Sequence, residues 1–186
     1  SGGGGQAWPR QEGSTLANMG AELGAEAGLM EPDQGTADFL RKAGAEPGDI
    51  ACRADVDAKP AEHHIFDANT LPPQGAAPHS PANAASVEEH AGTKVNVVYI
   101  GACTGAKLAD LRMAAEVLRG MKASKHVKLI VAPASLRDQE VARTEGTLQI
   151  MIDAGAQLLA NSCGICAGYG DTRFGEDGGA NSPTAV

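Results

Sequence analysis

VNVVYIGACTG, at residues 95–105, decides the fold of this chain. Its first six residues, 95–100, are dominated by apolar side chains, and the small residues that follow end the run. A continuous apolar run bounded by small residues is typical of a strand that is buried on both faces, as in a parallel sheet. The stretch therefore predicts a buried strand with Cys103 directly after its carboxyl end.

Two further strands are predicted downstream, each preceded by a helix. Apolar residues at steps of three and four predict helices over 108–121 and 138–154, and apolar runs predict strands over 127–132 and 156–160. Strands that alternate with helices favour a parallel sheet with right-handed crossovers. The predicted fold class is therefore α/β, a parallel βαβαβ unit with flanking helices, preceded by a helical and loop-rich segment.

The first half of the chain has a less regular pattern. Apolar periodicity predicts an amphipathic helix over 15–29, and Asp33 can cap a second helix over 36–43. Residues 63–66 are a candidate edge strand, and a proline-rich loop follows over 71–81. We expect four parts: a flexible N-terminal segment (1–13), a helical and loop segment (14–93), an α/β domain that carries the cysteine site (94–177) and a flexible C-terminal segment (178–186).

Composition and charge exclude several classes of function. The 186 residues carry a net charge of −8 without a cluster of Lys and Arg, so no nucleic-acid partner is expected. No apolar run approaches the roughly 20 residues that span a bilayer, and no secretory segment is recognisable. We therefore expect no membrane partner and a cytoplasmic location. Four cysteines in such a chain are typical of thiolate chemistry rather than of a disulfide framework.

Three of the cysteines follow predicted strands. Cys103 comes after the strand over 95–100, and Cys163 and Cys166 form a Cys-x-x-Cys motif after the strand over 156–160. Parallel strands end at one edge of the sheet, where ligands bind, so the topology predicts that the three thiols converge. Three thiolates are one short of a filled tetrahedral metal site or a fully thiolate-ligated cluster. A missing protein ligand leaves a position open for chemistry.

Other interpretations of these residues stay open at this point. A zinc site with a histidine or Cys52 as fourth ligand, or plain buried thiols, would use the same cysteines. A thioredoxin-like pair at Cys163 and Cys166 is disfavoured, because that motif normally opens a helix and residues 167–171 are a poor helix start. Cys52 is interpreted as a non-ligand. Arg173 could meet a substrate carboxylate or form a structural ion pair.

Five co-linear motifs resemble those of one enzyme family. They are Asn18-Met19-Gly20-Ala21-Glu22, Pro78-His79-Ser80-Pro81-Ala82-Asn83, Gly101-Ala102-Cys103-Thr104, Pro133-Ala134-Ser135 and Cys163-Gly164-Ile165-Cys166. In this order, and over roughly residues 14–177, the chain resembles the large subunit of the aconitase and 3-isopropylmalate dehydratase family. The resemblance implies an aconitase-like cluster-bearing domain.

The resemblance also implies a cofactor and a reaction. A [4Fe–4S] cluster would be held by Cys103, Cys163 and Cys166, and its remaining iron would act as a Lewis acid on a small hydroxy di- or tricarboxylic acid. By position, Asn18 would hydrogen-bond near the cluster and Glu22 would contact the oxygen on the iron. These two residues are four apart and so share one helix face.

Ser135 is the third catalytic residue that the resemblance implies, close to the site through its backbone and hydroxyl. The chain departs from the family at Gly105, where an asparagine is usual, so an amide beside the cluster is missing. The family's large subunit is also much longer, and its other acid/base groups, its substrate arginine and the serine base of its small subunit or swivelling domain lie outside this sequence.

The sequence therefore predicts an iron–sulfur hydro-lyase of the 3-isopropylmalate dehydratase or aconitase type, or the cluster-bearing portion of one. We expect a small-subunit or swivelling-domain partner that supplies the base. The alternative is a non-catalytic metal- or cluster-binding module that needs a partner chain.

Overall fold

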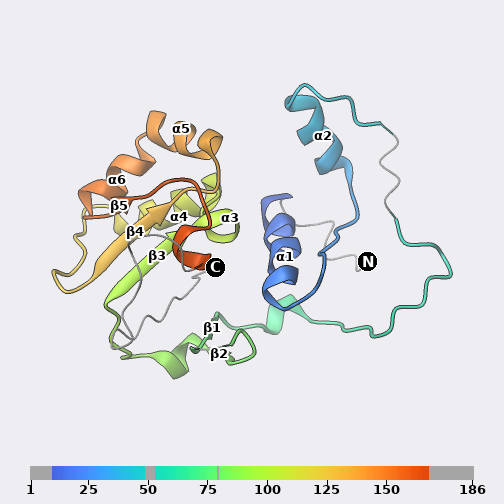
Figure 1. The fold of residues 1–186 in the computed structure, drawn as a ribbon, viewed down its shortest axis with the longest axis horizontal. Helices are drawn as coiled ribbons and strands as arrows, with labels where there is room; N and C mark the ends of the chain where they lie inside the picture. The colour runs from blue at the N-terminus through green and yellow to red at the C-terminus, as the bar shows by residue number, and fades with distance from the viewer. Residues whose placement is uncertain (1–9, 49–52, 79, 168–186) are drawn as a thin grey trace. The chain divides into compact units, whose positions relative to one another are not determined.

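The computed structural model describes residues 10–48, 53–78 and 80–167 of the chain (Figure 1). The chain divides into two compact units, Ser1–Leu71 and Pro72–Val186. The short helical turns within the units are α3 (Ala102–Gly105), η2 (Ala68–Thr70), η3 (Val87–His90) and η4 (Gly164–Ala167).

The first unit opens with helix α1 (Arg10–Glu22), which begins and ends earlier than the predicted helix over 15–29. Gly24 adopts the left-handed backbone conformation (φ 84°), and the Ala25 N–H donates to the Gly20 carbonyl oxygen (3.0 Å). A left-handed glycine with such a backward hydrogen bond ends a helix. The apolar periodicity beyond Glu22 therefore overstated the length of the helix.

The second helix of this unit is α2 (Gln34–Lys42), close to the predicted range of 36–43. The Asp33 carboxylate accepts a hydrogen bond from the Thr36 backbone N–H (2.8 Å). This bond satisfies one of the backbone donors left open at the start of a helix. The predicted cap by Asp33 is confirmed.

The candidate edge strand over 63–66 is not formed. These residues are part of no ladder, and the side chains of Ile65 and Phe66 are 86% and 75% exposed. A strand is stabilised by a neighbouring strand that pairs with its backbone. The prediction of a strand here was wrong because an apolar pair does not supply that neighbour.

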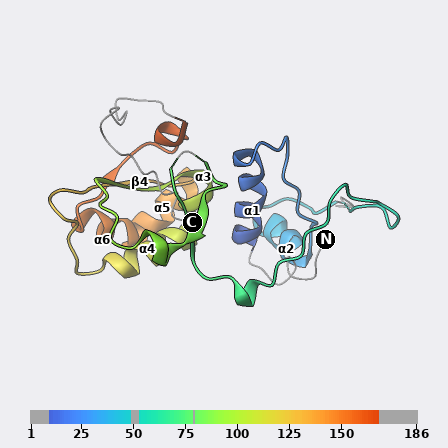
Figure 2. The same ribbon diagram turned by 90° about the horizontal axis from the view of Figure 1, so that it is seen from below.

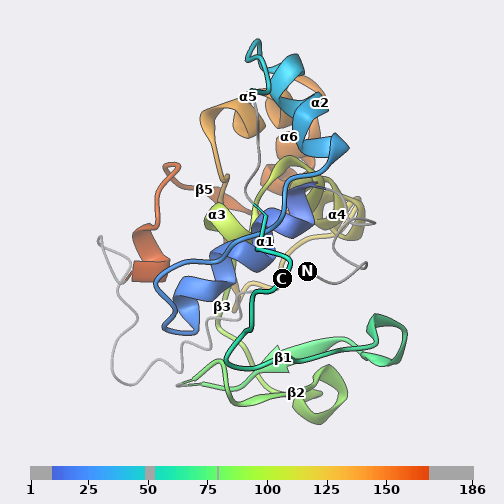
Figure 3. The same ribbon diagram turned by 90° about the vertical axis from the view of Figure 1, so that its right-hand side faces the viewer.

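The second unit begins with an antiparallel hairpin of β1 (Gln74–Ala76) and β2 (Ala84–Ser86) (Figure 3). The Asn83 side-chain amide donates to the Pro78 carbonyl oxygen (3.0 Å), and the Asn83 carbonyl oxygen accepts from the Ala77 N–H (3.0 Å). Residues 74–76 of the predicted proline-rich loop over 71–81 are therefore a strand, and the hairpin is tied together by Asn83.

The central element of this unit is a three-stranded parallel sheet with the order β3-β4-β5. The registers pair Gly101 with Ala132 and Val131 with Leu158, so the three strands end at one edge. The predicted α/β fold class with a parallel sheet is confirmed. The strands are β3 (Val97–Gly101), β4 (Lys128–Ala132) and β5 (Gln157–Leu158).

Three helices cover one face of this sheet. Because the strands occur in sequence order, right-handed crossovers place both sets of connecting helices on the same side. Leu111, Ala142 and Met151, one from each helix, are buried in one core with Val131 of β4. Figure 2 shows these helices on one side of the sheet and η4 on the other. The helices are α4 (Leu108–Leu118), α5 (Leu136–Thr144) and α6 (Thr147–Asp153).

The predicted helix over 138–154 is in fact two helices, α5 and α6. Gly146 separates them in the left-handed conformation (φ 86°), which a helix interior cannot contain. Glu145, which precedes it, accepts two hydrogen bonds from the Arg112 guanidinium of α4 (2.9 and 2.6 Å) and one from the Thr147 hydroxyl (2.6 Å). The carboxylate therefore joins all three helices at their junction.

Glu145→Gln is expected to make stability less dependent on acid pH. The Arg112 guanidinium, followed by the Thr147 hydroxyl, lowers the pKa of Glu145 from 4.5 to about 2. A carboxyl whose pKa is lowered by folding stabilises the protein above its unfolded-state pKa, and that contribution is lost as pH falls from about 4.5 to about 2. Urea unfolding at a series of pH values should show the variant less stable at neutral pH, with the gap closing across this window.

The matched control is Glu140→Gln on α5, since Glu140 pairs with Arg143 one turn along the same exposed helix. Such surface pairs contribute little to stability. A gap between Glu145→Gln and the parent protein that stays constant from pH 7 to pH 2 would contradict this role of Glu145.

Candidate functional site

Cys103 lies on the short helical turn α3, directly after β3, and is exposed. Its Sγ is 3.6 Å from the Thr104 hydroxyl oxygen. The Lys107 ammonium donates to the Thr104 carbonyl oxygen (3.1 Å), although the Lys107 residue is only 9% exposed. A buried ammonium is costly unless it is paired or hydrogen-bonded, so this contact fixes the turn that carries Cys103.

The segments that follow the three strands are tied to one another by hydrogen bonds. The Ala134 N–H, after β4, donates to the carbonyl oxygen of Ala106 (2.8 Å), after β3. The Asn161 side-chain amide, after β5, donates to the Pro133 carbonyl oxygen (2.9 Å). These bonds hold the loops of all three strands at the carboxyl edge of the sheet, where ligands bind in such folds.

The Cys-x-x-Cys motif is held in place by its internal isoleucine. Cys163 and Cys166 are both exposed, whereas Ile165 between them packs against the buried residues Tyr99 and Ile130. These residues are on the face of the sheet opposite the helices. The motif is thus fixed to the sheet by apolar contact, and its thiols stay accessible.

Tyr99 of β3 has a side-chain hydroxyl that lies near the three cysteines. It is 3% exposed, its hydroxyl makes no close hydrogen bond in the described part of the chain, and its side chain interacts with that of Cys166. Burial raises the pKa of this hydroxyl, and the nearby thiolates of Cys166, Cys163 and Cys103 raise the pKa further. All three cysteines therefore lie near this one hydroxyl.

Gly101 makes room for the Tyr99 side chain. The two residues are two apart on β3 and therefore lie on the same face of the sheet. A Cβ atom added at Gly101 would lie 2.4 Å from the Tyr99 Cζ and 2.5 Å from its hydroxyl oxygen. Only a glycine allows the tyrosine to reach the carboxyl edge of the sheet.

Three exposed thiols near one hydroxyl are a donor set that an iron–sulfur cluster takes. Within residues 10–48, 53–78 and 80–167, no group of three or more His, Cys, Asp or Glu side chains is arranged to hold one ion. Zinc needs all its ligands at about 2.0–2.3 Å from a single point. Thiolates around a cluster bind different irons and stand further apart, and cluster sulfurs accept hydrogen bonds of the kind that the Tyr99 hydroxyl has to offer.

Asn18 and Glu22 lie on α1 in the first unit. Asn18 is half-buried, and Glu22 is exposed at the last position of the helix. Residues four apart lie on one face of a helix, as the sequence predicted. Their roles toward the cysteines stay a prediction. Cys52 and Arg173 lie outside the described residues.

Ser135 follows β4 and caps helix α5. Its hydroxyl accepts a hydrogen bond from the Asp138 N–H (3.0 Å) and donates to the Asp138 carboxylate (2.8 Å). The hydroxyl therefore has a local structural role at the helix start. Ser135 nevertheless lies at the carboxyl edge, beside the loop that Asn161 ties to Pro133.

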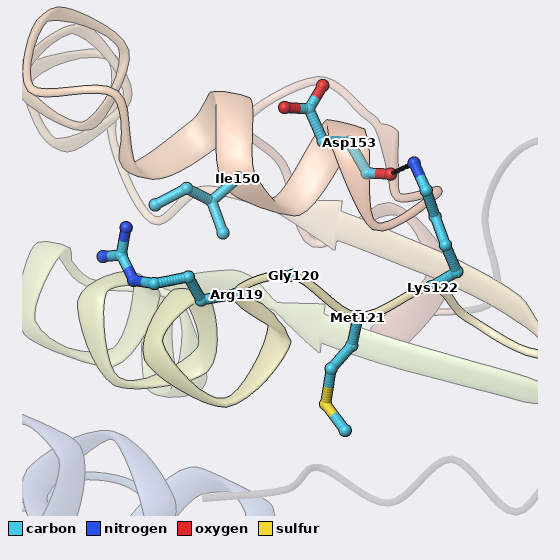
Figure 4. Close-up of a pocket in the computed structure, with 6 residues that line it drawn as sticks. All are labelled: Arg119, Gly120, Met121, Lys122, Ile150 and Asp153. Carbon is cyan, nitrogen blue, oxygen red and sulfur yellow. Dashed lines mark hydrogen bonds between the residues drawn. The ribbon is translucent and has the colours of Figure 1, made fainter.

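A cavity of about 190 Å³ lies elsewhere in the second unit (Figure 4). It opens where α4 ends, and the Lys122 ammonium at its rim donates to the Asp153 carbonyl oxygen. Because α4 begins beside Cys103 and runs away from it, the cavity is separate from the cysteine site. Its lining residues are Arg119, Gly120, Met121, Lys122, Ile150 and Asp153.

Four residues of the site were missed by reasoning from sequence alone. Tyr99 entered the sequence analysis only as part of a strand, and Gly101 and Ile165 only as parts of the cysteine motifs, without a role of their own. Lys107 was not singled out, since a lysine before a helix is most often exposed.

The sequence model of the Aconitase family (aconitate hydratase) matches residues 1–183. The chain belongs to the aconitase family. It is 40% identical over 158 residues to "3-isopropylmalate dehydratase large subunit 2" of Archaeoglobus fulgidus, with 85% of this chain and 38% of that protein covered. It is 39% identical over 162 residues to "Probable methanogen homoaconitase large subunit" of Methanosarcina mazei, with 87% of this chain and 41% of that protein covered.

The chain thus spans about two-fifths of the length of these curated relatives. Membership of the aconitase family agrees with the resemblance seen in the sequence motifs. Among the described residues, no helix combines the length and apolar character needed to cross a bilayer.

Proposed function

We propose that this protein carries the cluster-binding portion of an iron–sulfur hydro-lyase. Its substrate would be a small hydroxy di- or tricarboxylic acid of the 3-isopropylmalate or homoaconitate type. Cys103, Cys163 and Cys166 would hold a [4Fe–4S] cluster. The names of the relatives, which are dehydratase and homoaconitase large subunits, support this reaction class.

The observation that carries the proposal is the gathering of three accessible thiols around the buried Tyr99 hydroxyl. Three cysteines from two distant parts of the chain have no common structural task in a small α/β unit. Three thiolates in one place suit a cluster with one iron left open.

When bound, the cluster supplies a Lewis acid that polarises a substrate hydroxyl. The chain's own residues would bind and orient the substrate. The Asn18 amide is proposed to donate a hydrogen bond at the site, and the Glu22 carboxylate to contact the oxygen that leaves as hydroxide. The buried Lys107 ammonium, which donates to the carbonyl oxygen of Thr104 next to Cys103 in sequence, adds a positive charge to this turn and would favour an anionic acid in a chain of net charge −8.

Reconstitution with iron and sulfide under anaerobic conditions tests the cofactor. We expect about four iron and about four sulfide per chain, together with broad visible absorption. A colourless protein that binds about one zinc and no sulfide would instead support the zinc alternative. Iron with sulfide at this ratio supports the proposal, and zinc alone contradicts it.

A second experiment separates an enzyme portion from a non-catalytic module. We propose a small-subunit partner, since the relatives carry "large subunit" in their names and this chain matches only about two-fifths of them. The reconstituted chain alone should not convert isopropylmalate, homoaconitate or citrate. Addition of a family small subunit and of the rest of a large subunit should restore turnover. Continued inactivity of a cluster-loaded, partner-bound chain would favour the non-catalytic module.

A further inference from the structure

We propose that the Tyr99 hydroxyl donates a hydrogen bond to the sulfur atoms of the cysteine site and thereby raises the reduction potential of the cluster held there. The inference rests on the proposed function, because it assumes that the site holds a cluster. Neither the family match nor the relatives assign a role to this residue.

The first support is the state of the hydroxyl itself. Tyr99 is 3% exposed, and its hydroxyl makes no close hydrogen bond in the described part of the chain. The side chain with which it interacts is Cys166 of the Cys-x-x-Cys motif. A buried hydroxyl without a well-formed hydrogen bond is rare in folded proteins. Its one donor hydrogen therefore faces the sulfur atoms of the cysteine site.

The second support is where the hydroxyl lies. Gly101, at the end of β3, has no side chain, and the Tyr99 ring occupies the space that a Cβ atom would take. On the same face, the ring packs in one apolar cluster with Ile130 and with Ile165 of the Cys-x-x-Cys motif. These contacts fix the ring, so the hydroxyl is held at the edge where the cysteines are.

The third support is the chemistry of the groups that meet at this edge. A phenol hydroxyl is a hydrogen-bond donor, and the sulfur atoms of cysteine ligands and of a cluster are acceptors. Hydrogen bonds to the sulfurs of a cluster stabilise its reduced, more negative state and so raise its potential.

The test compares Tyr99→Phe with the parent protein after anaerobic reconstitution. The variant keeps the ring and removes one oxygen, so its fold and iron content should match those of the parent. Its reduction potential, measured by spectroelectrochemistry, should be lower. Equal potentials in the two proteins would overturn the inference.

The matched control is Ile130→Val, which removes one methylene from the same apolar cluster and leaves the hydroxyl intact. It should lower stability without changing the potential. Loss of iron from Tyr99→Phe alone would overturn the inference, because the hydroxyl would then be needed to hold the cluster rather than to set its potential. Loss of iron from both variants would overturn it, because packing alone would then explain the effect.

The outcomes keep the two proposals apart. A parent protein that takes up no iron and sulfide contradicts the proposed function, and the role of Tyr99 fails with it. A parent protein that loads fully, beside a Tyr99→Phe variant of unchanged potential, leaves the proposed function intact and removes the inference alone.

Discussion

Cys103→Ala is expected to abolish cluster assembly, with iron falling from about four per chain to less than one. Cys103 is the single thiol contributed by the β3 edge, whereas Cys163 and Cys166 come together from the segment after β5. Without Cys103, two neighbouring thiolates remain, and they cannot hold a four-iron cluster on their own. Cys163→Ala and Cys166→Ala should have the same effect. Iron and sulfide analysis after anaerobic reconstitution measures it.

Cys52→Ala is the matched control, because it removes the fourth cysteine of the chain, which the sequence interprets as a non-ligand. This variant should load as the parent does. Full iron content in Cys103→Ala, together with loss of metal in Cys52→Ala, would contradict the proposed ligand set and favour the zinc site with Cys52.

Gly101→Ala is the second variant with a large expected effect. The added Cβ would lie within 2.9 Å of three atoms of the Tyr99 side chain, which is buried and has nowhere to move. Overpacking of this kind costs about 1–3 kcal/mol of stability. Displacement of Tyr99 would also displace Ile165 and the cysteines beside it. We therefore expect a lower unfolding midpoint in urea and a several-fold loss of bound iron.

Gly48→Ala is the control for this substitution. Gly48 has no atom within 4 Å of an added Cβ, and its φ lies outside the left-handed region. Its replacement should change stability by no more than about 0.5 kcal/mol and leave iron loading intact. Equal stability and equal iron content in Gly101→Ala and the parent would contradict the prediction, because the Tyr99 side chain would then not need the space left by the missing Cβ of Gly101.

The second half of the fold could be predicted well from sequence because its signals are long and continuous. The apolar runs at 95–100 and 127–132 became β3 and β4 with shifts of one or two residues. A strand of a parallel sheet is buried on both faces and therefore needs a continuous run of apolar residues, which is visible in the sequence. The helices were less well bounded, since apolar periodicity does not show where a glycine turns left-handed, as Gly24 and Gly146 do.

The hairpin of β1 and β2 could not be predicted in the same way. Each strand has three residues, QGA and AAS, with no apolar alternation. The hairpin depends instead on hydrogen bonds from Asn83 across its tip, which composition does not reveal. Conversely, the sequence of residues 63–66 is typical of a strand, but these residues do not pair with a neighbouring strand.

The cysteines of the site could be predicted from the sequence, whereas the side chains packed between them could not. Topology alone brings Cys103 to the edge that carries Cys163 and Cys166, because parallel strands end on one side. The sequence does not say what lies between the thiols, since a strand tyrosine is most often plain core. Ser135 illustrates the reverse case: the resemblance implied a role at the site, whereas the structure shows its hydroxyl capping helix α5 through Asp138.

A crystal structure of the anaerobically reconstituted protein, with an anomalous map at the iron edge, tests the central claim most directly. The account predicts one compact four-iron peak bonded to the sulfurs of Cys103, Cys163 and Cys166, with the Tyr99 oxygen within hydrogen-bond distance of a sulfur. A metal peak bound to two of these cysteines alone, or a Cys103 sulfur turned away from it, would contradict the account.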